Sequence, residues 1–248
     1  MNNVVVITGA SRGIGAATAL LAAQRGYAVC VNYRSNRAAA NAVVSAITQS
    51  GARAIAVAAD IAVEAEVADM FTAVDRELGS VTALVNNAGI VDRQSRLEDM
   101  DAARLQRMFA INITGSFLCA REAVRRMSTR HGGSGGAIVN VSSGAARGGS
   151  PGEYIDYAAS KGAIDTLTIG LAREVAQEGI RVNAVRPGYV DTEIHASGGE
   201  PDRIERVKDS VPMKRVGQPG EIAHAILWLL SDEASFTTGA ILDVAGGK

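Results

Sequence analysis

Short, almost wholly apolar runs alternate with longer segments of helical periodicity along the 248 residues of the chain. The apolar runs are rich in β-branched residues and have the length of strands. They predict seven buried strands, at 4–8, 28–33, 54–59, 82–88, 136–143, 180–188 and 240–246. Apolar positions at helical spacing predict helices near 13–25, 36–50, 63–78, 97–129, 155–178 and 219–231.

Regular alternation of strand and helix is typical of parallel strands joined by right-handed crossovers. Strands that are apolar on both sides indicate a sheet covered by helices on both faces. The sequence therefore predicts a doubly wound α/β fold, with a seven-stranded parallel sheet in a single domain, 1–248. Residues 190–218 interrupt the alternation, but a strand follows them. We interpret 190–214 as a lid over a substrate site within that domain.

Composition narrows the class of protein. The chain is 47% hydrophobic and 21% charged, with a formal net charge of −1, so no basic footprint for nucleic acid or an anionic membrane is expected. No apolar run approaches the ~20 residues of a membrane span, and the N-terminus lacks the basic start of a signal peptide. Cys30 and Cys119 lie far apart in apolar surroundings, which predicts buried free thiols, no metal site and a reducing, cytoplasmic location.

Three glycines, Gly9, Gly13 and Gly15, stand between the first predicted strand and the first predicted helix in "VVVITGASRGIGAATALL". Glycine permits positive φ and a close approach of backbone to a ligand. The helix N-terminus beyond them offers free N–H groups and a positive dipole end. At the first strand of a doubly wound sheet, this pattern predicts a pyrophosphate-binding loop.

Two further motifs follow in order: "NNAG" at 86–89, at the end of the fourth predicted strand, and Tyr157-x-x-x-Lys161. Together with the Gly-x-x-x-Gly-x-Gly loop they resemble the classical short-chain dehydrogenase/reductase family over essentially the whole chain. The phrases "VNYRS", "YAASKGA" and "IRVN" are most similar to its bacterial glucose-dehydrogenase-like and 3-oxoacyl-carrier-protein-reductase-like members. The resemblance implies a Rossmann fold and an NAD(P)-dependent oxidoreductase acting on CH–OH groups.

The end of the second strand indicates which nicotinamide cofactor is used. A carboxylate there would bind the adenosine ribose and select NAD(H). This chain has Tyr33 followed by Arg34 and Ser35, and Arg34 can offer a charged donor fork to a 2′-phosphate. Arg12, in the glycine loop, is a second cation within reach. We therefore expect NADP(H) to be favoured, with NAD(H) also accepted.

The resemblance implies further cofactor contacts. Asp60 and Ile61 would lie at the adenine, although Asp60 is equally explained as a surface turn residue, and Asn87 is equally explained as a brace between strands. The full set of expected cofactor-binding residues is Gly9, Ser11, Arg12, Gly13, Ile14, Gly15, Arg34, Ser35, Asp60, Ile61, Asn87, Ala88, Gly89, Tyr157, Lys161, Pro187, Gly188, Val190 and Thr192.

Tyr157 and Lys161 suit proton transfer that accompanies hydride transfer. A tyrosine hydroxyl has an ordinary pKa near ~10, and a cation beside it favours the phenolate and lowers that pKa. Lys161 lies one helical turn after Tyr157, on the same helix face. Tyr154 has Ala158 at the corresponding position, so we expect no such cation beside it.

A hydroxyl donor to the substrate oxygen is expected from the end of the fifth strand, where Ser142 and Ser143 compete. The resemblance favours Ser143, although the stretch from Ser143 to Tyr157 is one residue longer than is usual in the family. Asn112 resembles the asparagine that holds a water in a proton relay to the lysine. The expected catalytic set is therefore Asn112, Ser143, Tyr157 and Lys161.

These residues predict a carbonyl reductase or alcohol dehydrogenase acting on a small-molecule carbonyl or secondary alcohol. Two alternatives remain: a protein that senses NADP(H) without turnover, and a dehydratase or epimerase on the same fold. The resemblance also implies a homotetramer. The closing "AILDVAGGK" matches the family's final strand, with Ala245 in place of the usual acidic residue.

Overall fold

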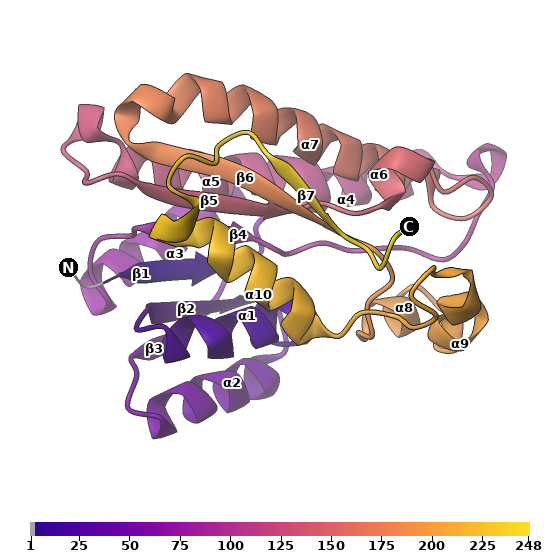
Figure 1. Cartoon of the computed structure of the whole chain (residues 1–248), viewed down its shortest axis with the longest axis horizontal. Coiled ribbons are helices and arrows are strands. Elements are labelled where there is room, and N and C mark those ends of the chain that lie inside the picture. Colours follow the sequence, from indigo (N-terminus) through magenta and orange to yellow (C-terminus); the bar gives the residue numbers. More distant parts are fainter. Residues whose placement is uncertain (1–2) are drawn as a thin grey trace.

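A parallel sheet forms the centre of the molecule, of which the computed structural model describes residues 3–248. Its strand order is β3-β2-β1-β4-β5-β6-β7 (Figure 1). The strands are β1 Val4–Ile7, β2 Ala28–Tyr33, β3 Ala54–Ala58, β4 Ala83–Asn86, β5 Gly136–Val141, β6 Ile180–Pro187 and β7 Ile241–Val244. All pairs are parallel, which confirms the predicted α/β fold, and the direction of winding reverses between β1 and β4.

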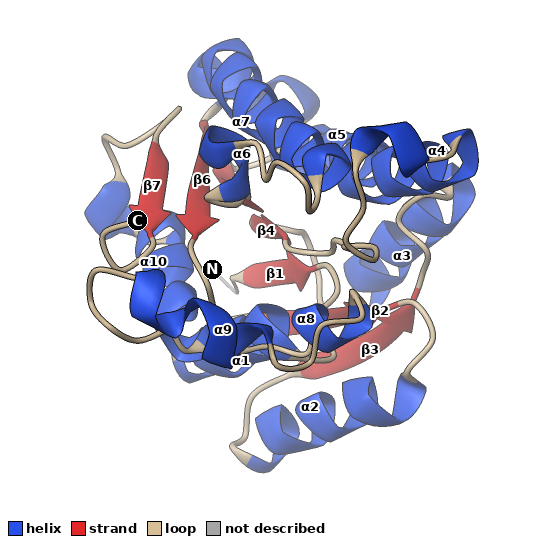
Figure 2. Cartoon of the chain, turned by 90° about the vertical axis from the view of Figure 1, so that its right-hand side faces the viewer, coloured by secondary structure: helices blue, strands red, loops and turns tan. Residues whose placement is uncertain are grey.

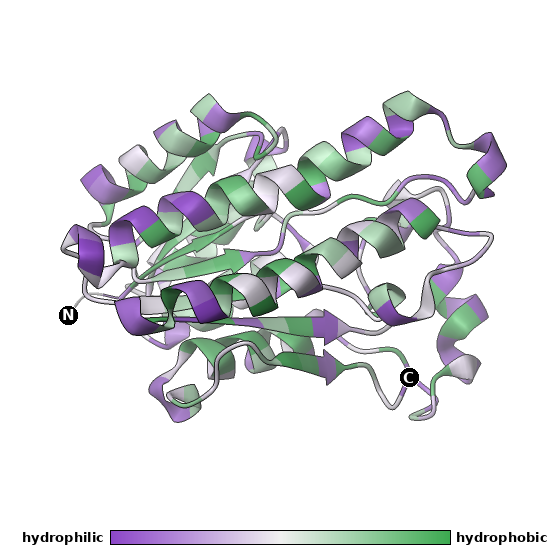
Figure 3. Cartoon of the chain, turned by 90° about the horizontal axis from the view of Figure 1, so that it is seen from above, coloured by the Kyte–Doolittle hydropathy of each residue, from purple (hydrophilic) through white to green (hydrophobic). Residues whose placement is uncertain are grey.

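Helices cover both faces of the sheet. The main helices are α1 Gly13–Gln24, α2 Arg37–Gln49, α3 Glu64–Glu77, α4 Ala102–Phe109, α5 Gly115–Met127, α7 Ile155–Val175 and α10 Pro219–Leu230. Buried residues of α1, α2 and α10 pack on one face of the strands, and those of α3, α5 and α7 pack on the other. In Figure 3 the strands are largely hydrophobic, while hydrophilic residues are spread along the helices around them.

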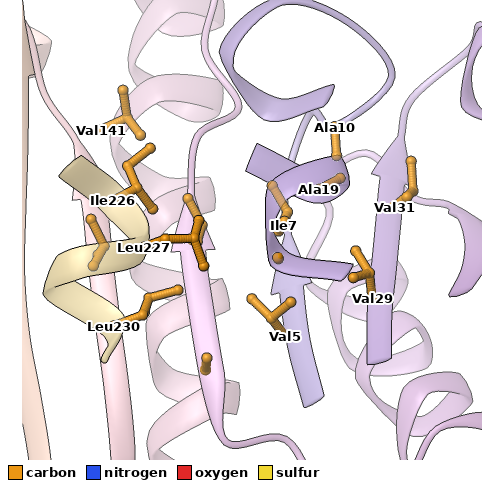
Figure 4. Packing of buried hydrophobic residues seen from close by; sticks show 14 of the residues in the cluster. Val5, Ile7, Ala10, Ala19, Val29, Val31, Val141, Ile226, Leu227 and Leu230 are labelled. Carbon is orange, nitrogen blue, oxygen red and sulfur yellow. The ribbon is translucent and has the colours of Figure 1, made fainter. Parts of the chain in front are cut away.

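Alternation along each central strand supplies both hydrophobic cores. Val5 and Ile7 of β1 belong to the first core, and their neighbour Val6 belongs to the second. Figure 4 shows Ile226 and Leu227 of α10 within the first core, on the same side of the sheet as the β1 and α1 residues. Full burial of each such side chain is worth about 1.5–3 kcal/mol, so the core holds the strand ends in fixed positions.

The prediction of one continuous helix at 97–129 is wrong. A short 3-10 turn, Leu97–Asp99, precedes α4, and a π-helical turn, Ala110–Thr114, separates α4 from α5. Asn112 lies in that turn, and its side chain bonds to the backbone of Ile90 in the loop after β4. Apolar periodicity continues through such a turn, so the sequence pattern alone does not reveal it.

Short helices that the sequence pattern did not predict gather at the carboxyl ends of the strands. They are α6 Ala145–Gly148, α8 Ile194–Ser197 and α9 Arg203–Val207. Figure 2 shows all three on the side of the molecule onto which the strand ends open. Helices α8 and α9 occupy the segment predicted as a lid.

Cys30 and Cys119 are free and buried, as predicted, and burial raises the pKa of each thiol to about 12. Within residues 3–248, no helix has both the length and the apolar character needed to cross a membrane.

Candidate active site

A cleft of about 1020 Å³ opens at the carboxyl ends of the strands, around the point where the winding reverses between β1 and β4. Ligands of doubly wound sheets bind at this position. The cleft is lined by every residue of the expected cofactor-binding set except Gly15, and by Ser143, Tyr157 and Lys161. Asn112 does not line it. The structure thus brings most of the predicted residues to one site.

The glycine loop leaves room that a side chain would fill. Gly9 has φ +61°, and a Cβ added there would lie 2.9 Å from the Cα of Ala88. Two residues that the sequence analysis missed hold the loop. The Asn32 side chain accepts from the Gly9 N–H at 3.1 Å, and the Thr8 hydroxyl accepts from the Asn87 and Ala88 N–H groups. Both are ordinary strand residues by type, so only the spatial arrangement identifies their role.

Asn87 and Gly15 support the loop from below. The Asn87 amide donates to the carbonyl oxygens of Thr8 and Gly9. Asn87 therefore braces the loop, and it also lines the cleft. Gly15 is buried, and a Cβ there would lie 2.6 Å from the Asn87 amide nitrogen. Gly15 therefore permits close packing of α1 beneath the loop, and its part in cofactor binding stays a prediction.

The N-terminus of α1 has the properties of an anion site. Among the described residues, no side chain caps it. Its first-turn N–H groups and positive dipole end adjoin the cradle at Gly9, in a cleft of dinucleotide size. The residues present therefore fit a pyrophosphate group.

The adenosine end of the cleft is lined by Tyr33, Arg34 and Ser35 at the end of β2 and by Asp60 after β3. Arg34 and Arg12 are exposed at the rim, and Arg12 also donates to the Ser197 hydroxyl of α8 at 3.2 Å. The Asp60 carboxylate accepts from the Ala62 N–H at 3.0 Å, so its turn role is present together with its position in the cleft.

Ser142 and Ser143 both line the cleft, but only Ser143 affects the pKa of Tyr157, which its side chain lowers. Ser142 is buried and donates to the carbonyl of Lys161 at 3.3 Å. The connection between Ser143 and Tyr157 contains helix α6 and left-handed residues at Gly149, Ser150 and Gly152.

Lys161 lies over the Tyr157 ring, with its Nζ 5.7 Å from the ring centroid, and donates to the Val141 carbonyl at 2.8 Å. The expected lowering of the Tyr157 pKa by Lys161 is not found. Burial raises the pKa of Tyr157, and the hydrogen bond from Ser143 lowers it in part. Burial also lowers the pKa of Lys161 to about 8, against a weaker raising effect of Asp165. Desolvation of both groups outweighs their mutual attraction.

The lowered pKa of Lys161 predicts a pH-dependent stability. Below pH 8 both the folded and the unfolded chain carry the proton, and the folded state bears the cost of a buried ammonium. Between pH 8 and 10.5 the folded Lys161 loses its proton while the unfolded lysine keeps it, so stability rises with pH. We expect the unfolding free energy of the wild type to gain ~3 kcal/mol over Lys161→Met across this window. Urea unfolding at a series of pH values measures this, and parallel profiles of the two proteins would contradict it.

Asn112 is buried, and its side chain braces the loop after β4. Its Oδ1 accepts from the Ile90 N–H at 2.9 Å, and its Nδ2 donates to the Ile90 carbonyl at 3.0 Å and to the Ser160 hydroxyl. An added Cβ on Gly89 would lie 3.5 Å from both Asn112 Oδ1 and Lys161 Nζ. Asn112 thus lies near the lysine but behind the cleft wall, and its side chain supports the backbone.

The chain is similar to known proteins over almost its whole length, and this similarity identifies its family. Residues 9–248 match the family model described as enoyl-(acyl carrier protein) reductase. The chain is 60% identical over 245 residues, 99% of each chain, to a protein of Escherichia coli (strain K12) named uncharacterized oxidoreductase YgfF. It is 42% identical to the cis-4-hydroxycyclohexanecarboxylate dehydrogenase of Sinomonas cyclohexanicum over 244 residues, 98% of this chain and 95% of the relative.

A crystal structure of a short-chain type dehydrogenase/reductase from Mycobacterium marinum superposes with a TM-score of 0.91 at 34% identity, covering 99% of this chain and 94% of the other. The chain belongs to the short-chain dehydrogenase/reductase family. The predicted family and its enzyme class are thereby confirmed, and the family implies a nicotinamide cofactor in the cleft.

Several residues that line the cleft of this short-chain dehydrogenase/reductase near Tyr157 were not predicted from the sequence. Glu153, Tyr154, Tyr189, His195 and Arg203 all line it. Tyr154 does have a cation beside it, contrary to expectation: the Arg203 guanidinium of α9 lies 4.9 Å from its ring centroid. Helical spacing predicts only partners on the same helix, whereas Arg203 belongs to α9.

The last predicted residues of the cofactor-binding set also line the cleft. Strand β6 ends at Pro187, Gly188 follows it, and an added Cβ on Gly188 would lie 2.9 Å from the Cα of Ala245. Val190 pairs with Gly217 in an isolated bridge, which fixes the start of the lid segment, and Thr192 lies against Gly13 of the glycine loop. The lid segment therefore contacts the phosphate loop.

Proposed function

We propose that the protein is an NADP(H)-preferring carbonyl reductase and alcohol dehydrogenase in which Tyr157 transfers the proton. One observation carries the proposal: Tyr157 and Ser143 line the cleft together, with the Lys161 ammonium 5.7 Å from the centroid of the Tyr157 ring. A sensor would not require this set of groups at the mouth of a dinucleotide site.

Each of these residues would have a separate role in the reaction. A bound nicotinamide donates or accepts the hydride. The Tyr157 hydroxyl gives its proton to the carbonyl oxygen during reduction and takes one from the alcohol during oxidation. Ser143 donates a hydrogen bond to the same oxygen, and the Lys161 ammonium lies over the ring of the phenolate that remains. Asn112 acts by holding the Ile90 backbone, and any water relay would pass behind the cleft wall.

Arg34 supports the preference for NADP(H), because a guanidinium at the end of β2 can bind a 2′-phosphate and no carboxylate follows Tyr33 in the sequence to repel one. We expect Arg34→Ala to lower kcat/KM for NADPH about 10–100-fold, the range of a charged hydrogen bond, and to change kcat/KM for NADH little. Arg25→Ala, at the other end of α1, is the matched control. Equal losses with both cofactors would contradict this role.

The catalytic proposal is tested by following NADPH and NADH oxidation in parallel with sugars, acyl thioesters, cyclohexanone and 4-oxocyclohexanecarboxylate. The last ketone is included because of the name of the Sinomonas relative. Ketone-dependent oxidation that is faster with NADPH supports the proposal. Tight NADPH binding without turnover on the whole panel would instead favour a sensor, and conversion without net cofactor consumption would favour an epimerase.

We also propose a homotetramer. Large apolar side chains are exposed at Phe117 of α5, Ile169 of α7, Trp228 of α10, Phe236 and Leu242 of β7. Exposed apolar side chains of this kind would pack in the interfaces of a tetramer with closed symmetry. Light scattering after gel filtration should give four times the mass of the chain, and a monomer at micromolar concentration would exclude this assembly.

A further inference from the structure

Four side chains from four separate segments form an alternating stack of rings and cations at the substrate half of the cleft. The Arg203 guanidinium lies 4.9 Å from the ring centroid of Tyr154 and 5.6 Å from that of Tyr189. The Lys248 ammonium lies 4.5 Å from the Tyr189 centroid. All four residues line the cleft. Each of these distances is within the range of a cation–π interaction.

Arg203 connects the lid to the catalytic helix. It belongs to α9, whereas Tyr154 immediately precedes α7, which carries Tyr157 and Lys161, and Tyr189 follows β6. In Figures 1 and 2, α9 lies apart from the main helical layers, at the carboxyl ends of the strands. Arg203 is only 6% exposed, which is unusual for an arginine on a short peripheral helix.

Two carboxylates compensate the buried charge. Arg203 bonds to Glu153 of the loop before α7 and to Glu200 of the lid, each at 2.5 Å. Arg206 bonds to the same two carboxylates. Two cations and two anions leave this cluster without net charge, so Arg203 has no uncompensated charge to offer to an anionic substrate.

We propose that Arg203 is a positioning residue that holds the lid closed and fixes Tyr154 and Tyr189 as the walls that contact the non-reacting part of the carbonyl substrate. The proposal rests on the carbonyl reductase function and deepens it. Two fixed ring walls favour a ring-sized substrate body. A carboxylate on the substrate would gain little from Arg203 or Arg206, because both arginines are already paired with Glu153 and Glu200.

The chain offers a matched control for the test. Arg206 shares both carboxylates with Arg203, but its side chain is 52% exposed and it stacks on neither tyrosine. Arg203→Met removes the charge and the stack, whereas Arg203→Lys keeps the charge but loses the planar fork. Arg206→Met removes an arginine from the same cluster and leaves the stack in place. Thermal melting of each variant checks that it is folded.

The first readout is hydrogen exchange of residues 194–210 in the full-length protein saturated with NADPH. Arg203→Met and Arg203→Lys should both exchange faster across this segment, and Arg206→Met should resemble the wild type. Unchanged exchange in folded Arg203→Met would overturn the proposal. This readout needs no turnover, so it decides the role of Arg203 even if the proposed reaction is wrong.

The second readout compares cyclohexanone with 4-oxocyclohexanecarboxylate. Arg203→Met should raise KM for both ketones by a similar factor, on the order of tenfold, because both lose the same walls. The Kd for NADPH should change less than about threefold, because Arg203 lies at the substrate half of the cleft. A loss confined to 4-oxocyclohexanecarboxylate would make Arg203 an anion receptor and overturn the proposal. Failure of the wild type with both ketones would count against the reductase function on these substrates and not against the lid contact.

Discussion

Tyr157→Phe is expected to lower kcat for ketone reduction on the order of 10³-fold, the usual contribution of a general acid, while the Kd for NADPH stays close to that of the wild type. The substitution removes one oxygen atom and keeps the ring under the Lys161 ammonium. The Ser143 hydroxyl remains and can still bind the substrate oxygen, but no group is left that can supply the proton.

Tyr154→Phe is the control for this prediction, because Tyr154 lines the same cleft three residues earlier. Its hydroxyl has only a long contact of 3.4 Å from Arg203, and its ring would still stack on that guanidinium. We expect its kcat to stay within a few-fold of the wild type. Comparable losses in the two variants would mean that Tyr157 acts through packing and not through its proton.

Gly9→Ala is expected to lower kcat/KM for NADPH on the order of 10²-fold. The new Cβ would lie 2.9 Å from the Cα of Ala88 and within the cradle that faces the cofactor. The positive φ of Gly9 would add about 1–3 kcal/mol of backbone strain. Steady-state kinetics with NADPH and a direct binding titration both measure the effect.

Gly26→Ala separates backbone strain from obstruction of the cleft. Gly26 follows α1 with φ +84°, and a Cβ there would meet nothing within 4 Å. It should lower the melting temperature by a similar or smaller amount than Gly9→Ala and leave NADPH binding intact. If Gly26→Ala weakened NADPH binding as strongly, general destabilisation would explain both results and the cradle would not be needed.

The fold and the cofactor half of the cleft could be predicted because their determinants are local in sequence. Apolar periodicity marked each strand and the main helices, except for the break between α4 and α5, and the glycines of the loop stand between β1 and α1, where the chain itself brings them to the strand ends. Sequence spacing does not distinguish a glycine that faces a ligand from one that, like Gly15, permits close packing.

The substrate half could not be predicted, because its contacts join segments far apart in the chain. Arg203, Tyr154 and Tyr189 meet only when α9 lies over the start of α7. The predicted lowering of the Tyr157 pKa was wrong for a related reason. Burial raises this pKa, and the burial of Tyr157 depends on the whole surrounding fold. The bonds between the Asn112 side chain and the Ile90 backbone likewise join two separate segments of the chain.

The most direct test of the central claim is the transfer of a label from NADPH that carries deuterium at both C4 positions, with cyclohexanone and the other carbonyl compounds of the panel. We expect one deuterium on the carbinol carbon of each alcohol molecule formed, one NADPH consumed per product, and loss of product in Tyr157→Phe. Tight NADPH binding with no deuterium in any product, or conversion without consumption of NADPH, would contradict it.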